Sequence, residues 1–321
     1  MRICRSNWKR AAAAAVLVLA SVPATGQEYP SKPIRLVVGF PPGGTMDVYA
    51  RILVKPLQDR LKTPVFVDNR PGAGGMIAAA GVARADPDGY TLLHIAPSTL
   101  SKVFVKDPPL DFNKALQPIA SYWTSPFVLT INTQVPATTA KEFVDYAKAN
   151  PGKLNYGSTN AVSMLPMAML AGIAGLELQR IEYKANPQVH TALLTNELQA
   201  TVSTIQAIQP LMNSGKIRIL MVTGSQRLAA IPNVPTTTEA GYPGLQPFVI
   251  GTIMGPTGMP AAASAKLAAV MKEIVAMPDI DKLLSGNGRA LNVSLDELSR
   301  LLREEEALWA TAAKMAGYKP E

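Results

Sequence analysis

Hydrophobic positions along the chain come in short runs that alternate with longer amphipathic stretches. In the first third, the runs typical of buried strands are 34–40, 65–68 and 91–95, and the helical stretches between them are 47–61 and 77–85. Strands and helices that alternate in units of this length predict a parallel sheet with right-handed crossovers. A loop-rich stretch with three prolines follows, in which 121–123 and 127–132 are expected to be strands or crossing segments.

The alternation then restarts, which predicts a second α/β unit. Its strands are expected at 154–157, 181–183, 198–202 and 217–222, and its helices at 139–149, 164–174, 188–194 and 208–213. A long proline-rich surface passage, interrupted by the apolar segment 248–254, leads to helices at 262–276, 278–286 and 295–316. Two α/β series separated by loop-rich crossings predict two lobes with a cleft between them.

The last of these helices combines an apolar stripe with a run of charges. We expect the stripe, which includes Leu298, Leu302 and Trp309, to be packed. The charged segment 303–306 (REEE) is expected to be a solvated face, and a docking site for a partner helix is the alternative.

The first 26 residues have the three-part pattern of a secretory signal peptide. Four basic residues and no acidic one precede the apolar run 11–20. The segment Ala24-Thr25-Gly26 places small residues directly before the predicted cleavage site. A membrane anchor is the alternative, but the apolar run is far shorter than the roughly 20 residues that span a bilayer. Cleavage after Gly26 predicts a soluble periplasmic protein without cysteine, because Cys4 lies in the removed segment.

Composition and charge narrow the function classes. The chain is 48% hydrophobic and 17% charged, which is globular composition. Removing the four basic residues of the leader from the total of 31 leaves 27 basic against 23 acidic residues, a net charge of +4. That balance, with scattered basic residues and no aromatic stacking set, argues against a nucleic-acid partner.

Enzymatic motifs are absent from the sequence. The two histidines, His94 and His190, are each expected to be structural and hydrogen-bonded. No metal-ligand spacing, Gly-x-Ser-x-Gly elbow, phosphate loop or complete dinucleotide fingerprint is present. We therefore predict no catalytic residues, no metal and no cofactor. A catalytic Asp or Lys on a loop without a motif stays open as an alternative.

Four polar loops that follow predicted strands favour ligand binding instead. They are 41–45 (PPGGT), 69–75 (NRPGAGG), Ser98-Thr99 and 156–160 (YGSTN). Free N–H groups and the positive dipole end at a helix start suit a carboxylate, although Asp47 could simply cap its helix. In open α/β sheets ligands collect at the carboxyl ends of strands, so the three loops of the first unit point to one crevice, with the fourth facing them.

Several segments in order resemble one family. The segments are 29–35 (YPSKPIR), Asn69 to Gly75, 87–92 (PDGYTL), 156–158 (YGS), Tyr183-Lys184, 215–218 (GKIR), 234–236 (VPT) and 239–241 (EAG). With Phe40, Pro42 to Gly44 and Asp47, they are similar to the Bug-type receptors, the periplasmic solute-binding proteins of tripartite tricarboxylate transporters. The resemblance covers nearly all of the chain after residue 26.

The resemblance implies a Venus-flytrap fold with no catalytic function. Lobe 1 would comprise residues 27–125 and 251–321, and lobe 2 residues 126–250. The ligand would be a small carboxylate held by backbone groups and ordered waters at the loop from Phe40 to Asp47. The expected ligand-binding residues are Phe40, Pro42, Gly43, Gly44, Thr45, Asp47, Gly74, Gly75, Ser98, Ser158, Thr159, Asn160, Ser163, Lys184 and Ser203. The expected partner is a membrane permease, and the expected state is a monomer.

The second lobe departs from the family pattern. Asn160 and Val162 replace glycines, Pro166-Met167 replaces His-Leu, and Ser203 stands where an aspartate is common. These changes favour a ligand with an uncharged or aromatic distal end, and a repurposed pocket is the alternative. A ligand-sensing subunit of a membrane sensor kinase would use the same pocket, and the sequence does not separate that role from transport.

Overall fold

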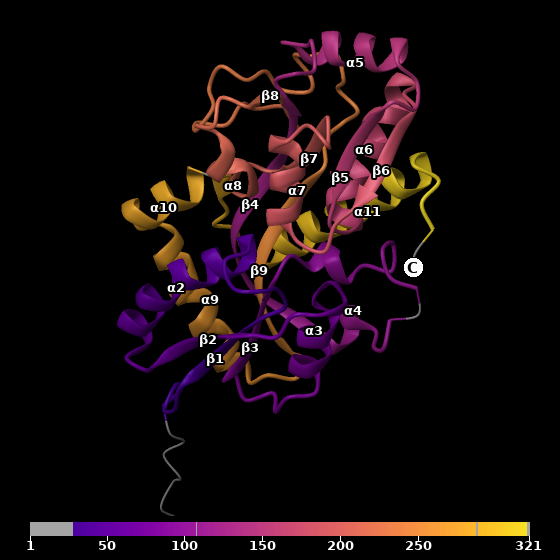
Figure 1. Ribbon diagram of the computed structural model, residues 1–321. Helices are drawn as coiled ribbons and strands as arrows, with labels where there is room; N and C mark the ends of the chain where they lie inside the picture. The colour runs from indigo at the N-terminus through magenta and orange to yellow at the C-terminus, as the bar shows by residue number, and fades with distance from the viewer. Residues whose placement is uncertain (1–27, 107, 287, 320–321) are drawn as a thin grey trace, which may run out of the picture.

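The computed structural model of the protein describes residues 28–106, 108–286 and 288–319. The expected signal peptide, residues 1–26, lies outside the described residues. The strands form one continuous ten-stranded system in the order β2-β1-β3-β9-β4-β7-β5-β6, with β10 and β8 also pairing with β4. Figure 1 shows this system as two stacked lobes, with β1 to β3 in one and β5 to β8 in the other.

The first lobe is built on three parallel strands, as the sequence predicts. They are β1 (Ile34–Val38), β2 (Val65–Asn69) and β3 (Thr91–Ile95), and their crossover helices are α2 (Thr45–Leu61) and α3 (Met76–Ala83). Late in the chain, α9 (Ala261–Val275), α10 (Pro278–Ser285) and the short β10 (Arg289–Ala290) return to this lobe. Strands β1 and β3 are buried on both faces, which explains why their sequences are continuous apolar runs.

The second lobe repeats the pattern. Its strands are β5 (Leu154–Ser158), β6 (Leu178–Glu182), β7 (Ala200–Thr204) and β8 (Ile217–Val222), and its helices are α5 (Ala140–Ala149), α6 (Ala161–Ala174), α7 (Asn186–Leu194) and α8 (Ile205–Ile208). Strand β5 pairs in parallel with β6 and β7. Most of the predicted elements are therefore present, with most ends shifted by up to three residues. The helix expected at 208–213 is the exception, because α8 ends at Ile208 and a 3-10 helix, η3 (Gln209–Leu211), follows it.

Two long strands cross between the lobes, and they differ from the elements predicted for these segments. The segments expected separately at 121–123 and 127–132 belong to one strand, β4 (Leu116–Asn132), which follows the short helix α4 (Phe112–Ala115). The apolar segment 248–254, which was expected to interrupt the surface passage but was not assigned to an element, belongs to the buried strand β9 (Phe248–Pro256). The two strands run antiparallel to each other, which local periodicity does not reveal.

The partners of β4 change halfway along its length. Up to Pro126 it pairs with β9, and from Phe127 onward it pairs with β7 and β8. One strand thus belongs to the core of both lobes, and its burial is nearly continuous. The lobes are joined by β-structure rather than by a flexible linker.

The last helix, α11 (Leu295–Met315), contradicts one expectation from its sequence. It contacts α6 in the second lobe as well as β4, β9 and the short turn η2 (Pro97–Leu100). Trp309 and Leu298 are buried as predicted, but Glu305, which was expected on a solvated face, is 1% exposed. Among the described residues, no helix has both the length and the hydropathy that crossing a bilayer requires.

Candidate functional site

Asp47 organises the loop that joins β1 to α2. Its Oδ2 accepts hydrogen bonds from the Gly43 N–H at 2.8 Å and from Arg51 Nε at 2.9 Å, and its Oδ1 accepts one from Asn69 Nδ2 at 2.9 Å. The same Asn69 amide donates to the Phe40 carbonyl at 3.0 Å. Asp47 therefore ties the loop to the end of β2 and is not a simple helix cap, since the N-cap is Gly44.

The Asp47 carboxyl is ionised although it is 2% exposed. Burial acts to raise its pKa, but the hydrogen bonds from Arg51, the Gly43 N–H and Asn69 outweigh burial and leave the pKa below its ordinary value. The Gly43 N–H is therefore hydrogen-bonded to Asp47 and is not available to a ligand. The first-turn N–H groups of Thr45 and Met46 have no helical partner and remain the donors that this loop can offer a ligand.

The glycine loop after β2 packs directly against the first loop. A Cβ on Gly39 would lie 2.7 Å from the Gly75 Cα, so only hydrogen at residue 39 allows this approach. A Cβ on Gly75 would lie 3.6 Å from the Phe40 ring and 3.2 Å from the Ile95 side chain at the end of β3. Gly74 and Gly75 also adopt positive φ angles of 63° and 97°. The structure thus brings the three predicted strand-end loops of the first lobe together.

Ser98, the third-loop candidate, lies in η2 and is 5% exposed. Its hydroxyl is buried and has no hydrogen-bond partner among the described residues, and the turn packs against α11. Residues of η2 pack against η1 (Ala73–Gly75), which connects this turn to the glycine loop.

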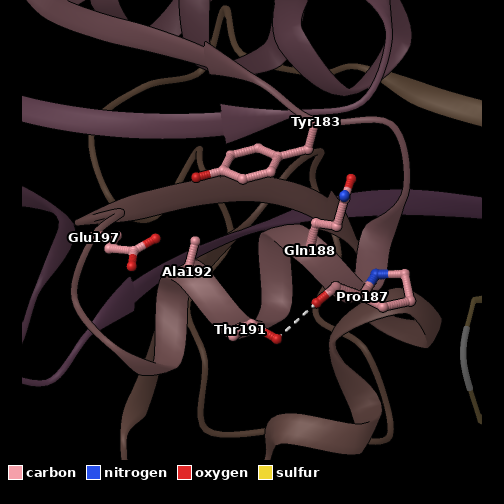
Figure 2. A pocket seen from close by; sticks show the side chains of 6 residues that line it. All are labelled: Tyr183, Pro187, Gln188, Thr191, Ala192 and Glu197. Carbon is pink, nitrogen blue, oxygen red and sulfur yellow. Dashed lines mark hydrogen bonds between the residues drawn. The ribbon is translucent and has the colours of Figure 1, made fainter.

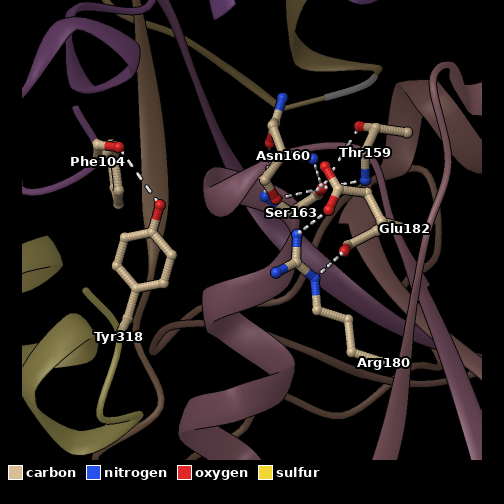
Figure 3. Close-up of polar contacts among 8 residues, drawn as sticks. Phe104, Thr159, Asn160, Ser163, Arg180, Glu182 and Tyr318 are labelled. Carbon is tan, nitrogen blue, oxygen red and sulfur yellow. Dashed lines mark hydrogen bonds and ion pairs between the residues drawn. The ribbon is translucent and has the colours of Figure 1, made fainter. Parts of the chain in front are cut away.

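In the second lobe, the candidates at the end of β5 form a local network, which Figure 3 shows with its neighbours. Asn160 caps α6 by accepting a hydrogen bond from the Ser163 N–H at 3.0 Å, and the Ser163 hydroxyl accepts one from the Thr159 N–H at 2.9 Å. Ser158 is buried, and its Oγ accepts a hydrogen bond from Arg180 Nε at 3.0 Å.

Arg180 was not among the predicted site residues. Its Nη2 forms an ion pair with Glu182 Oε2 at 3.1 Å, and its side chain is 28% exposed. Arg180 lies in β6, the last strand of the sheet order, whose sequence LQRIE is rich in polar residues, as a solvated edge strand also is. Asn69 was also missed as a site residue, although it ends a strand inside the family motif.

Two further candidates stand outside this network. The Lys184 side chain is exposed, and its backbone N–H donates to Gln188 Oε1 at 2.9 Å. The Ser203 hydroxyl is buried without a hydrogen-bond partner among the described residues. The described hydrogen bonds link candidates within each lobe, and none links a first-lobe candidate to a second-lobe candidate.

A pocket lies beside α7. Its lining includes Tyr183, the neighbour of Lys184 in sequence, but not Lys184 itself. Figure 2 shows its lining residues, which are Tyr183, Pro187, Gln188, Thr191, Ala192 and Glu197. The Thr191 hydroxyl is committed to the Pro187 carbonyl at 3.1 Å. The pocket contains none of the predicted ligand-binding residues.

The histidines carry no site. His94 is fully buried and stacks on Tyr122 with 4.9 Å between ring centroids, but neither ring nitrogen has a hydrogen-bond partner among the described residues, contrary to expectation. Burial lowers its pKa to about 3, so the ring is neutral. His190 lies on α7, as predicted. The described residues include no group of three or more His, Cys, Asp or Glu that could hold a metal ion.

Two α/β lobes joined by crossing strands, with polar loops at the strand ends, define the class of the periplasmic binding proteins. Residues 49–317 match the family model described as tripartite tricarboxylate transporter family receptor. The chain is 33% identical over 311 residues to a UPF0065 protein of Bordetella bronchiseptica, covering 96% of this chain and 92% of that protein. The chain belongs to this family of receptors, which are binding proteins and not enzymes, as the sequence motifs indicated.

Solved structures agree with the assignment. The structure of R. palustris Rpa4515 with adipate has a TM-score of 0.85 and 27% sequence identity, and the match covers 92% of this chain and all of that one. MatC from Rhodopseudomonas palustris with bound malate has a TM-score of 0.79 and 26% identity, covering 88% of this chain and 99% of the other. The two-lobe fold expected from the sequence is confirmed.

Proposed function

We propose that this receptor captures a small organic acid and that the loop from Phe40 to Asp47 holds its carboxylate. The observation that carries the proposal is the Asp47 network, which fixes the loop and leaves the first N–H groups of α2 without helical partners. Such N–H groups, at the positive end of a helix dipole, stabilise an anion without a lysine or arginine.

The negative charge of Asp47 is compatible with an anionic ligand. Arg51 neutralises it at 2.9 Å, and Asn69 and Gly43 supply two further hydrogen bonds. The carboxylate oxygens are therefore occupied, and the field that the ligand meets comes from the free N–H groups. Two similar structures, one with adipate and one with bound malate, support a carboxylate as the ligand class.

The second lobe supplies the other wall of the proposed site. Ser158, Thr159, Asn160, Ser163, Lys184 and Ser203 are the proposed contacts for the distal end of the ligand, and Arg180 joins them through Ser158. The hydrogen bonds of the Asn160–Ser163 cap occupy the backbone N–H groups of Thr159 and Ser163, so these donors are not available to a ligand. The charge of Arg180 is paired with Glu182, and the loss of the aspartate at position 203 removes an acceptor for an amino group, which fits a distal end that is uncharged, aromatic or weakly polar.

Closure about the crossing strands is the proposed capture step. The lobes would then be residues 27–125 with 251–321, and residues 126–250. The exchange of β4 partners between Pro126 and Phe127 supports a hinge at this boundary. Export through residues 1–26, delivery to the permease of a tripartite transporter and a monomeric state belong to the same proposal.

A thermal-shift and calorimetry panel tests the ligand class. The panel holds adipate, malate, benzoate and acidic amino acids, each beside its ester or amide, and uses residues 27–321. Ligand at 100 times its Kd adds about 2.7 kcal/mol to the free energy of unfolding. We expect a free acid to raise the Tm and its ester to have no effect. Equal shifts from acid and ester, or no shift from any acid, would overturn the proposal.

The partner is tested separately. Purified receptor, with and without the acid found above, is passed over immobilised permease and over the sensor domain of a kinase. Ligand-dependent retention on the permease supports transport. Retention on the kinase domain alone would replace transport by sensing while leaving the ligand class intact.

A further inference from the structure

Helix α11 packs against both lobes. It contacts η2 of the first lobe and α6 of the second, and it also contacts the crossing strands β4 and β9. When the lobes rotate toward each other, one rigid helix cannot follow both of them. Closure therefore has to change either the contact between α11 and the first lobe or the contact between α11 and α6, and the chemistry of the two contacts indicates which.

Directional contacts attach α11 to the loop that follows η2 in the first lobe. Ser101 Oγ donates a hydrogen bond to Glu306 Oε1 at 3.3 Å. The Tyr318 hydroxyl, just after the helix, donates one to the Phe104 carbonyl at 3.3 Å, as Figure 3 shows. The Phe104 ring also meets the Trp309 indole edge-on, with 5.5 Å between ring centroids. This loop is therefore attached to the C-terminal segment at three points.

The interface between α11 and α6 has no such contacts. Every residue of the two helices is described, and no hydrogen bond or ion pair joins one helix to the other. Helix α6 carries no charged side chain, and the hydroxyl of Ser163 is used in the cap at its own N-terminus. Its buried Met164 and Met169 belong to the same hydrophobic cluster as Ala312 and Ala313 of α11. Methionine side chains adapt readily to a changed apolar surface.

Trp309 lies at the boundary between the lobes. Its indole is fully buried and meets the Phe127 ring edge-on, with 5.9 Å between ring centroids. Phe127 is the residue from which β4 pairs with β7 and β8 instead of β9. Atoms close to the axis of a rotation are displaced least. Trp309 therefore holds α11 at the place where closure about the crossing strands disturbs its packing least.

We infer that α11 moves with the first lobe and that the second lobe slides along it on α6 when the protein closes. The inference rests on the proposed function and specifies where its closure takes place. Sliding between packed helices amounts to about 1–2 Å and exchanges one set of apolar contacts for another. Detaching α11 from the loop after η2 would instead break two hydrogen bonds. Because Asn160 and Ser163 form the cap of α6, the slide moves this wall of the proposed site relative to Ser98 in η2.

Two engineered disulfides test which interface moves, because residues 27–321 contain no cysteine. The α6–α11 link combines Gly172→Cys with Met315→Cys. Both positions are exposed, and a Cβ on residue 172 would lie 3.6 Å from the Met315 carbonyl oxygen. The matched control, the α11–loop link, combines Ser101→Cys with Glu306→Cys, whose native side chains are 3.3 Å apart. Thiol titration checks that each link has formed, and a short bis-methanethiosulfonate bridge replaces a disulfide that does not form.

Pulsed EPR measures the distance between the lobes in the linked and reduced forms. The spin labels are attached to p-acetylphenylalanine in place of Lys55 in the first lobe and Lys148 in the second, both exposed. In the ligand-free protein the α6–α11 link should narrow the distance distribution. It should also abolish the shortening that adipate causes in the reduced form and weaken adipate binding by at least about tenfold, because the closed state is no longer populated. The α11–loop link should leave all three quantities unchanged.

The opposite pattern, in which only the α11–loop link has these effects, would overturn the inference. An effect of both links, or of neither, would overturn it as well, and so would an effect that persists after reduction with dithiothreitol, since it would come from the substitutions. If no acid binds to any form, the proposed function fails, while the width of the ligand-free distance distribution still decides which interface moves.

Discussion

The Asp47 carboxylate and the Asn69 amide meet at 2.9 Å, although 22 positions separate them in sequence. Asp47 lies in the first turn of α2 and Asn69 is the last residue of β2, so their contact fixes one strand-end loop on another. Because Asn69 also holds the Phe40 carbonyl, the geometry of the proposed carboxylate loop depends on both side chains.

Replacing Asp47 by alanine should loosen this loop. The substitution removes three hydrogen bonds to a buried ionised group and leaves Asn69 and the Gly43 N–H without that acceptor. We expect a loss of about 2 kcal/mol in the free energy of unfolding and weaker adipate binding. Urea denaturation and calorimetry measure the two effects. Asp59→Ala, which breaks an exposed ion pair on the same helix, should cost less than about 0.5 kcal/mol, and equal behaviour of the two variants would make Asp47 unimportant.

Gly39→Ala tests the close approach of the first two loops. The new Cβ would lie 2.7 Å from the backbone of Gly75, which cannot yield like a flexible side chain. Overpacking of this kind costs about 1–3 kcal/mol and should displace the ligand loop. Gly81→Ala is the matched control, because residue 81 lies in α3 with open space around it, and there alanine should stabilise the protein by about 0.5–1 kcal/mol. Unchanged stability and affinity in Gly39→Ala would contradict the described packing.

Arg180→Met tests the second-lobe wall. Arg180 is partly exposed, so the free energy of unfolding should change by less than about 1 kcal/mol. The buried Ser158 hydroxyl would lose its only described donor, and we expect about tenfold weaker acid binding, equivalent to about 1.4 kcal/mol. Arg227→Met, which breaks the exposed pair with Glu239 in the same lobe, serves as control. Matching affinities for the two variants would remove Arg180 from the site.

The buried His94 should make the protein sensitive to mild acid. Its folded pKa of about 3 lies below the ordinary value of 6.5, so the unfolded chain takes up a proton first as the pH falls. Stability is therefore lost progressively below pH 6.5, by about 1.4 kcal/mol at about pH 5.5. His94→Phe, which keeps a ring against Tyr122, should remove this part of the pH dependence in urea titrations from about pH 5 to about pH 7. His190→Phe should remove less, because His190 is only partly buried.

Ionisation of Glu305 changes the free energy of unfolding in the direction opposite to that of His94, over an overlapping pH range. Its pKa, which burial raises to about 8, means that the folded protein keeps a proton that the unfolded chain has released, so stability falls as the pH rises from about 4.5 to about 8. Wild type should therefore show a shallow pH profile in which the two groups partly cancel. Glu305→Gln should steepen the acid side of that profile and flatten its neutral side, and urea titrations of both single variants separate the contributions. A Gln variant with the wild-type profile would show that Glu305 keeps its ordinary pKa.

The local pattern predicted the elements well because burial on both faces leaves continuous apolar runs. The strand 91–95 was predicted with its observed ends, and the helix at 139–149 begins one residue later than expected, with Thr139 as its cap. The crossing strands were predicted poorly. Proline at 118 and 126 divides β4 in sequence, yet pairing with β9 on one side and with β7 and β8 on the other keeps it one strand.

The sequence by itself therefore determined the two α/β series, the polar loops at the strand ends and the family. The tertiary structure decided which polar groups are buried and what they meet. Glu304, Glu305 and Glu306 are three consecutive residues of the same type, but only Glu305 is turned toward β9. It lies on the same face of the helix as Trp309, one turn away. Such differences depend on contacts between residues far apart in the chain, and local periodicity does not encode them. The charge state and the hydrogen-bond partners of a buried side chain therefore depend on the surroundings that those long-range contacts create.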